Sequence, residues 1–172
     1  MFGSAQHSNE TTPGRAHFIF VVAPGIYAGP DTHASKGPLV TLHASGNFDV
    51  KTTAQDDKSP DPLLGRYALD KQYHGELEGI GVGQMLTAGT QVKGSGAYVA
   101  IEKVSGSLKS RTGSFVLEHM GTMTENVPQL AISIVPDSGT AGLTGIAGKM
   151  TITIAAGGKH SYDLEYTLPK GG

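Results

Sequence analysis

Residues 96–123 read GAYVAIEKVSGSLKSRTGSFVLEHMGTM, and this stretch decides the fold. Two runs rich in β-branched, aromatic and other apolar residues flank the sequence SRTG at residues 110–113, which is typical of a turn. Apolar and polar side chains alternate within both runs, and this period of two is that of a half-buried strand. The stretch therefore predicts a long β-hairpin.

The hydrophobic pattern also predicts how the two strands of the hairpin pair. With this loop, Leu108 lies opposite Phe115 and Val104 lies opposite His119 on one inner face. A slip of one residue would move Phe115 to the other face of the sheet. In the predicted register Glu102 is diagonal to His119, at a Cα separation of about 7–8 Å.

Glu102 and His119 are a candidate acid/base pair. A carboxylate beside an imidazole in an apolar interior suits proton transfer, because burial and the partner's charge shift both pKa values. A structural ion pair, or a pair at the barrel mouth facing water, explains the same spacing. Lys71 is a cation on the otherwise apolar face of a predicted strand at residues 67–78. It needs either the barrel mouth or a carboxylate, and Glu102 is its natural partner.

Composition excludes several classes of protein. The chain has 172 residues, no cysteine and a net charge of -2, which indicates one domain with neither disulfides nor an electrostatic case for nucleic acid. No apolar run approaches the roughly 18 residues that span a bilayer. The seven histidines show neither H-x-H nor H-E-x-x-H spacing, so we expect no metal site and no cofactor. The chain contains no G-x-S-x-G sequence, so the sequence does not support a serine hydrolase.

Further alternating segments flank the hairpin on both sides. With its two strands they make eight, at residues 41–51, 67–78, 83–88, 129–135, 150–154 and 160–168. Consecutive antiparallel strands joined by short turns predict an all-β protein with a single closed eight-stranded barrel at residues 39–170. Leu143 and Ile146, in a glycine-rich turn, are predicted to plug one end.

The glycine-rich sequence at residues 79–83 does not have the G-x-G-x-x-G spacing of a phosphate-binding loop, and no helix pattern follows it. We interpret it as a bend between two strands.

Residues 1–38 differ from the rest of the chain. Residues 1–14 are polar and predict a disordered N-terminal extension. The apolar residues 18–22 allow a second interpretation, the core of a cleaved secretory signal. A start codon placed too far upstream is a third. We expect a cytoplasmic protein, or a secreted or periplasmic one if this segment is a signal.

The predicted inner face mixes bulky and small side chains, which leaves room for a cavity. Tyr73, Tyr98, Tyr162 and Phe115 are the candidate ligand-binding residues, and the tyrosine hydroxyls could donate hydrogen bonds to a carbonyl or hydroxyl group. Core packing with satisfied hydroxyls is the other interpretation of these tyrosines. The expected partner is a small apolar or amphipathic molecule.

Four motifs also resemble a known family. The chain is similar to the mostly bacterial domain of unknown function 3224, in DKQYHGELEG (70–79), GAYVAIE (96–102), GSFVLEH (113–119) and VPDSGT (135–140). The resemblance spans about residues 41–168. It implies a barrel like those of allene oxide cyclase and dirigent-type proteins, with a cavity and no settled activity.

Three hypotheses for function remain. In the first, the barrel binds a small molecule and carries out isomerase, cyclase or lyase chemistry, with Glu102 as base, His119 as its partner or proton shuttle and Lys71 as an electrostatic stabiliser. In the second, it is a carrier without catalysis. In the third, Val99 and Ile101, predicted to lie on the outer face, form the subunit interface of a homo-oligomeric structural protein.

Overall fold

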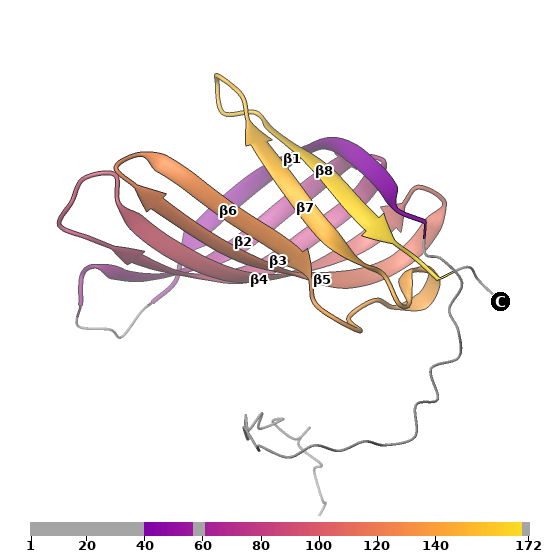
Figure 1. The fold of residues 1–172 in the computed structure, drawn as a ribbon. Helices are drawn as coiled ribbons and strands as arrows, with labels where there is room; N and C mark the ends of the chain where they lie inside the picture. Colours follow the sequence, from indigo (N-terminus) through magenta and orange to yellow (C-terminus); the bar gives the residue numbers. More distant parts are fainter. Residues whose placement is uncertain (1–39, 57–60, 170–172) are drawn as a thin grey trace, which may run out of the picture. The chain divides into compact units, whose positions relative to one another are not determined.

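The computed structural model describes residues 40–56 and 61–169. The predicted extension at residues 1–38 lies outside the described residues. The strands are β1 (Leu42–Ala54), β2 (Leu64–Gly75), β3 (Leu77–Gly89), β4 (Gly96–Leu108), β5 (Arg111–Thr124), β6 (Val127–Ile134), β7 (Ala147–Ile154) and β8 (His160–Thr167), with one 3-10 turn, η1 (Ala141–Leu143) (Figure 1).

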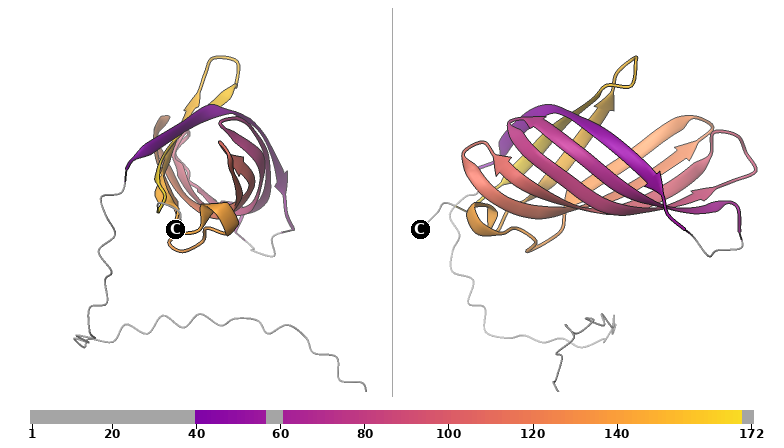
Figure 2. Two further views of the ribbon diagram at one scale, coloured as in Figure 1. Left: turned by 90° about the vertical axis from the view of Figure 1, so that its right-hand side faces the viewer. Right: turned by 180° about the vertical axis from the view of Figure 1, so that it is seen from behind.

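The strands form a closed ring. Each pairs antiparallel with the next along the chain, and β1 pairs with β8 to complete the barrel (Figure 2, left). The prediction of an all-β, eight-stranded antiparallel barrel is confirmed. No helix in the part of the chain that the structure describes is long and apolar enough to cross a membrane.

The ring is uneven in length and in pairing. β1 to β5 have 12 to 14 residues each, whereas β6, β7 and β8 have 8. β6 and β7 share a single register pair, Ser133 with Lys149. The β7–β8 hairpin leans away from β6 in Figure 1, so the β6–β7 seam is the weakest join of the barrel.

The β4–β5 hairpin is real, but its predicted register is wrong by four residues. Leu108 pairs with Arg111 and Val104 pairs with Phe115, so the loop contains only residues 109 and 110. Lys109 has a φ of 52°, the left-handed conformation that such a tight turn demands. The SRTG sequence that was predicted to turn begins in this loop and continues into β5. An even shift keeps every side chain on its predicted face.

The glycine-rich residues 79–83 are not a bend. They lie in the middle of β3, which is one continuous strand from Leu77 to Gly89 and not a short strand from residue 83. Gly79, Gly81 and Gly83 share the inner face of the barrel, where partner strands leave no space for side chains. A Cβ at Gly79 would overlap with the carbonyl oxygen of Ser105.

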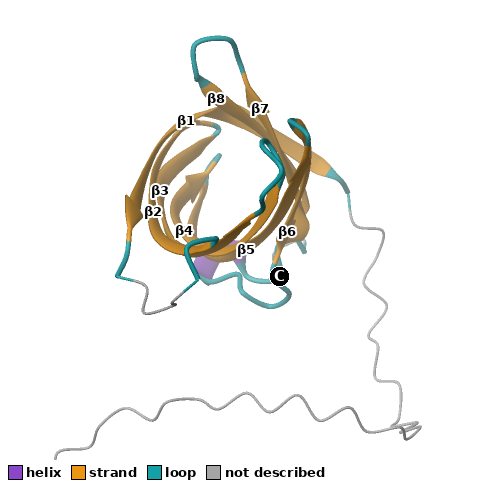
Figure 3. Ribbon diagram, turned by 90° about the vertical axis from the view of Figure 1, so that its left-hand side faces the viewer, coloured by secondary structure: helices purple, strands orange, loops and turns teal. Residues whose placement is uncertain are grey.

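One end of the barrel is filled with apolar side chains. Leu143, the last residue of η1, and Ile146 are almost fully buried there, as predicted. η1, purple in Figure 3, lies against the start of β5. Around these two residues the core contains Leu77, Leu108, Phe115, Leu117, Leu164 and Tyr166.

The other end is open. There the alternation of the strands continues, but inner-face side chains are no longer covered. Met123 is 43% exposed, Leu130 44% and Ile154 65%. Tyr67, Met85 and Tyr98, on the same face, are half-buried. Water therefore reaches inner-face apolar surface at this end.

Candidate functional site

A buried polar cluster lies on the inner face between the filled and open ends. Its centre is Glu102 on β4, which is 0% exposed. Lys71 Nζ donates a hydrogen bond to Glu102 Oε2 at 2.7 Å, and Tyr73 Oη donates one to Oε1 at 2.8 Å. Lys71 Nζ also donates to Tyr73 Oη at 3.3 Å. The predicted contact of Lys71 with Glu102 is confirmed.

His119 completes the cluster from β5. Its Nε2 lies 3.1 Å from Glu102 Oε2, and its side chain is 4% exposed. Nε2 and Oε2 are in direct contact, and His119 is the largest of the influences that lower the pKa of Glu102. Beyond this contact, Nε2 has no hydrogen-bond partner among the described residues. Glu102 is diagonal to His119 as predicted, although across a different register.

Strand geometry explains how these side chains meet. Lys71 and Tyr73 lie two residues apart on β2 and therefore share a face. β3 separates them from Glu102, and Gly81 is the β3 residue opposite Lys71. A Cβ at Gly81 would overlap with Glu102 Oε1 and would lie 3.1 Å from the Tyr73 ring. The missing side chain of Gly81 is what lets the cluster form across β3.

Lys71 also contacts aromatic rings. Its Nζ lies 4.8 Å from the centroid of the Phe48 ring and 5.6 Å from that of Tyr73, within the range of cation–π attraction. Phe48 in turn packs on Tyr73 and on His160, with centroid separations of 5.4 Å and 5.0 Å. The ammonium group is therefore held between the Glu102 carboxylate, the Tyr73 hydroxyl and the face of the Phe48 ring.

The electrostatics of the cluster favour a charged carboxylate and a neutral phenol. Burial opposes ionisation of Glu102, but His119, Lys71 and Tyr73 outweigh it and hold the pKa of Glu102 below its ordinary value. Burial, followed by the charge of Glu102 and the hydrogen bond to it, raises the pKa of Tyr73 far above its ordinary value. Tyr73 therefore remains a hydrogen-bond donor to Glu102 at any physiological pH.

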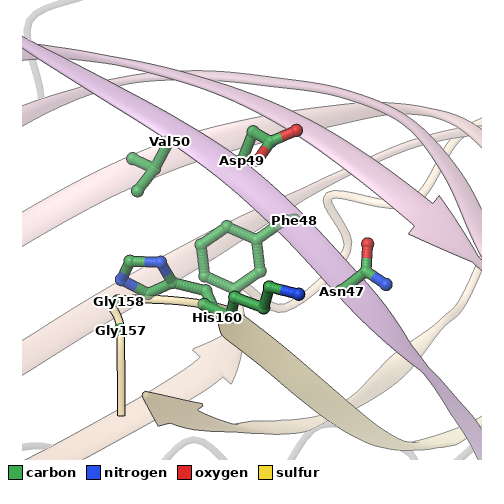
Figure 4. Close-up of a pocket in the computed structure, with 8 residues that line it drawn as sticks. Asn47, Phe48, Asp49, Val50, Gly157, Gly158 and His160 are labelled. Atoms are coloured by element: carbon green, nitrogen blue, oxygen red, sulfur yellow. The ribbon is translucent and has the colours of Figure 1, made fainter. Parts of the chain in front are cut away.

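A pocket of about 420 Å³ lies beside the cluster, where the β7–β8 hairpin separates from β1 (Figure 4). Phe48 and Val50 of β1 line it together with His160 and the turn at Gly157 and Gly158. The Phe48 and His160 rings lie next to each other in Figure 4. Val50 pairs with Lys71 across the β1–β2 ladder. Phe48 is thus the wall between this pocket and the ammonium group of Lys71.

The four predicted ligand-binding residues lie in different parts of the barrel. Only Tyr73 joins the cluster. Phe115 is core, and Tyr162 Oη is occupied by the β2–β3 turn, where it accepts a hydrogen bond from the Leu77 backbone N–H at 2.9 Å. Tyr98 packs over Gly121 toward the open end. Phe48 was not predicted as a site residue, and its inward alternation on β1 was the only signal for it.

Among residues 40–56 and 61–169, no group of three or more His, Cys, Asp or Glu side chains could hold a metal ion. What the cluster does offer is hydrogen bonds and proton transfer. Lys71 Nζ carries three N–H donors and uses two of them within the cluster. The third N–H is the donor that remains for another molecule.

Comparison with known proteins places the chain in a family. Residues 44–166 match the family described as "Protein of unknown function (DUF3224)". A crystal structure of a DUF3224 protein of unknown function from Shewanella oneidensis MR-1 is similar, with 43% sequence identity and a TM-score of 0.70; the match covers 78% of this chain and 100% of that one. No functionally curated protein matches. The barrel and its buried cluster are therefore those of a member of the DUF3224 family.

Proposed function

We propose that the barrel binds a small amphipathic molecule whose polar group contacts Lys71 and His119. The observation that carries this proposal is the buried Lys71–Glu102 ion pair, with His119 Nε2 3.1 Å from the same carboxylate. A ligand oxygen within reach of Lys71 Nζ and His119 would add hydrogen bonds to groups that are already removed from water.

The ion pair itself supports a functional role. Removing two charges from water costs several kcal/mol per ion, and well-packed apolar residues often serve stability as well or better. Lys71 and Glu102 nevertheless occupy inner-face positions that apolar residues fill elsewhere in the barrel. Clusters of this kind, with shifted pKa values, are frequent at sites that bind or transform a ligand.

The apolar part of the ligand needs an apolar surface beside the cluster. The pocket beside Phe48 has a volume within the range of small-molecule sites, but polar residues line much of it and Phe48 separates it from Lys71. The exposed inner-face side chains of the open end, Met123 and Leu130 among them, supply apolar surface on the other side of the cluster. The open-end surface continues along β5 from His119, which is the arrangement that an amphipathic molecule needs.

The chemistry that suits this cluster is movement of a proton within the bound molecule, as in an isomerase, cyclase or lyase reaction. We assign the proton transfer to His119, the positioning of Lys71 and His119 to Glu102, and stabilisation of a developing oxyanion to the third N–H of Lys71. The lowered pKa of Glu102 makes it a weaker base than an ordinary carboxylate, which is why His119 takes that role here. The expected resemblance to allene oxide cyclase barrels would be an analogy of fold and does not carry this assignment.

A carrier without catalysis is the second candidate. The saturation of Glu102 by Lys71 and Tyr73 favours it, because a fully hydrogen-bonded carboxylate is suited to hold a structure in place. Proton exchange distinguishes the two functions. If a molecule released from the native protein exchanges carbon-bound hydrogen in D₂O only with wild-type protein and not with His119→Gln, the barrel is an enzyme.

Binding is tested by native mass spectrometry of the gently purified full chain and by titration with 1-anilinonaphthalene-8-sulfonate, an amphipathic anion. We expect His119→Gln and Lys71→Met to weaken binding of this dye by about tenfold, equivalent to roughly 1.4 kcal/mol. The matched controls are the exposed His43→Gln on β1 and Lys149→Met on β7. Ile101→Thr reports dye bound to the outer face. Equal affinities in all variants that remain folded by circular dichroism would refute the proposed site.

A further inference from the structure

The outer face of β3, β4 and β5 is unusually apolar. Leu86, Val99 and Met120 follow one another in register across the three strands. Ile101 lies on the same face of β4, and the remaining members are Ile80 and Val82 of β3. The exposed fractions of these six side chains run from 48% for Val82 to 63% for Met120.

A groove of about 480 Å³ crosses this face. It extends from Gln84 and Leu86 on β3 to Ala131 and Ser133 on β6, and Val99, Ile101 and Met120 form its middle. Single exposed apolar residues are common on monomeric proteins, but a contiguous set with a groove usually marks an interaction site.

We propose that a second copy of this chain binds to the outer face of β3–β5 across a two-fold axis. Charge complementarity selects this occupant. Lys103 and Glu118 lie on the same outer face, diagonal to each other across the β4–β5 ladder. Lys103 has no acidic side chain within ion-pairing distance among the described residues, and Glu118 accepts a hydrogen bond from Ser133 Oγ alone.

A two-fold axis in the plane of the interface, passing close to Ile101, would bring Lys103 of each copy to Glu118 of the other. Such an isologous contact forms twice by symmetry. The same axis would place Ile101 and Leu86 each beside its own counterpart, and Met120 over Val82. One apolar centre with one cation and one anion is self-complementary, whereas nucleic acid would require an excess of positive charge.

The proposal is tested by sedimentation velocity of the full chain, from below 1 µM to about 100 µM protein. We expect a reversible monomer–dimer equilibrium. Lys103→Glu and Glu118→Lys should each raise the dissociation constant at least tenfold, because each creates two like-charge contacts. The double variant should restore dimerisation to within about threefold of wild type.

The control is Lys149→Glu, which breaks an exposed ion pair with Glu165 on β7–β8 and should leave the equilibrium unchanged. A wild-type chain that stays monomeric over the whole range would overturn the proposal. So would a trimer or larger ring, or a double variant no stronger than the single ones. These outcomes do not bear on the inner site, because none of the substituted side chains faces the barrel interior.

Discussion

The two faces of β4 reverse the usual distribution of polarity. Glu102 points inward and is 0% exposed, while its neighbour Ile101 points outward and is 55% exposed. In a barrel built only for stability, the charge would face water and the aliphatic side chain the core. The filled end of the same barrel follows that rule with Leu108, Phe115 and Leu164 inside. β4 departs from this rule on both faces. Its inner face at Glu102 belongs to the proposed binding site, and its outer face at Ile101 belongs to the proposed dimer interface.

Glu102→Gln is the change that should disturb this comparison most. It leaves the ammonium group of Lys71 buried without a counter-charge, so we expect a loss of about 3–5 kcal/mol in the free energy of unfolding, measured with urea. The double variant Lys71→Met/Glu102→Gln should recover more than half of that loss. Glu78→Gln, at an exposed position, is the control. A fully stable single variant would mean that the pair is not an energetic unit.

The difference in unfolding free energy between wild type and Glu102→Gln should also depend on pH. Because the folded protein holds the pKa of Glu102 below its ordinary value of 4.5, Glu102 stabilises the fold fully above that pH. The stabilisation disappears as pH falls through the lower, folded pKa. The stability difference between wild type and Glu102→Gln should therefore be constant above about pH 5.5 and shrink in acid. A difference that grows in acid would contradict the lowered pKa.

Tyr73→Phe should cost about 1.5–3 kcal/mol, since it removes one hydrogen bond to a buried carboxylate. The raised pKa of Tyr73 adds a second signature. A group whose pKa is raised by folding contributes stability below its unfolded pKa, and that contribution is lost as pH rises above about 10. Thermal melts between pH 8 and 11 should thus fall more steeply for wild type than for Tyr73→Phe. If the melting temperatures of the two proteins fall in parallel, a group other than Tyr73 is responsible for the loss of stability at alkaline pH.

Gly81→Ala tests the space that the cluster occupies. The added Cβ would meet Glu102 Oε1 and the Tyr73 ring, so we expect a loss of about 1–3 kcal/mol from overpacking. Gly89→Ala on the same strand has its nearest contact at 3.6 Å and should be nearly neutral. If both variants unfold at the same urea concentration, the cluster can shift without cost.

Ile101→Thr, the outward counterpart of Glu102→Gln, should have the smallest effect. Both residues are good strand formers, and an exposed substitution changes stability by less than about 0.5 kcal/mol. The measurement is urea unfolding at the lowest practical protein concentration, since a dimer would add a concentration-dependent term. A loss comparable with that of Glu102→Gln would show that Ile101 is not a surface residue of the monomer.

The faces of the strands were predictable from sequence, and the registers were not. The alternation predicts that Lys71, Glu102 and His119 share the inner face of the barrel, and this is sufficient to predict that they cluster. Alternation repeats every two residues, however, and cannot distinguish registers that differ by four. The actual turn at Lys109 lacks the Asn-Gly or Asp-Gly sequence that is typical of a two-residue loop. The SRTG sequence therefore predicts the turn in the wrong place.

The prediction of a bend at the glycines of β3 is wrong for a related reason. Gly79, Gly81 and Gly83 weaken a strand by propensity and therefore suggest a bend. Their role depends on neighbours contributed by β2 and β4, at positions that only the folded ring defines. The pocket beside Phe48 is likewise a product of where the β7–β8 hairpin leaves β1, which no local pattern encodes.

The single pair that joins β6 to β7 has a kinetic consequence. Amide protons in β7 that point toward β6 lack the ladder partners that protect those between β7 and β8. Hydrogen exchange at Met150–Ile154 should therefore alternate along the strand, with every second amide exchanging quickly. Unfolding would start at this seam, so the ring would open as a curled sheet of eight strands before its long hairpins separate. The barrel is closed in topology, yet its last join is the first to break.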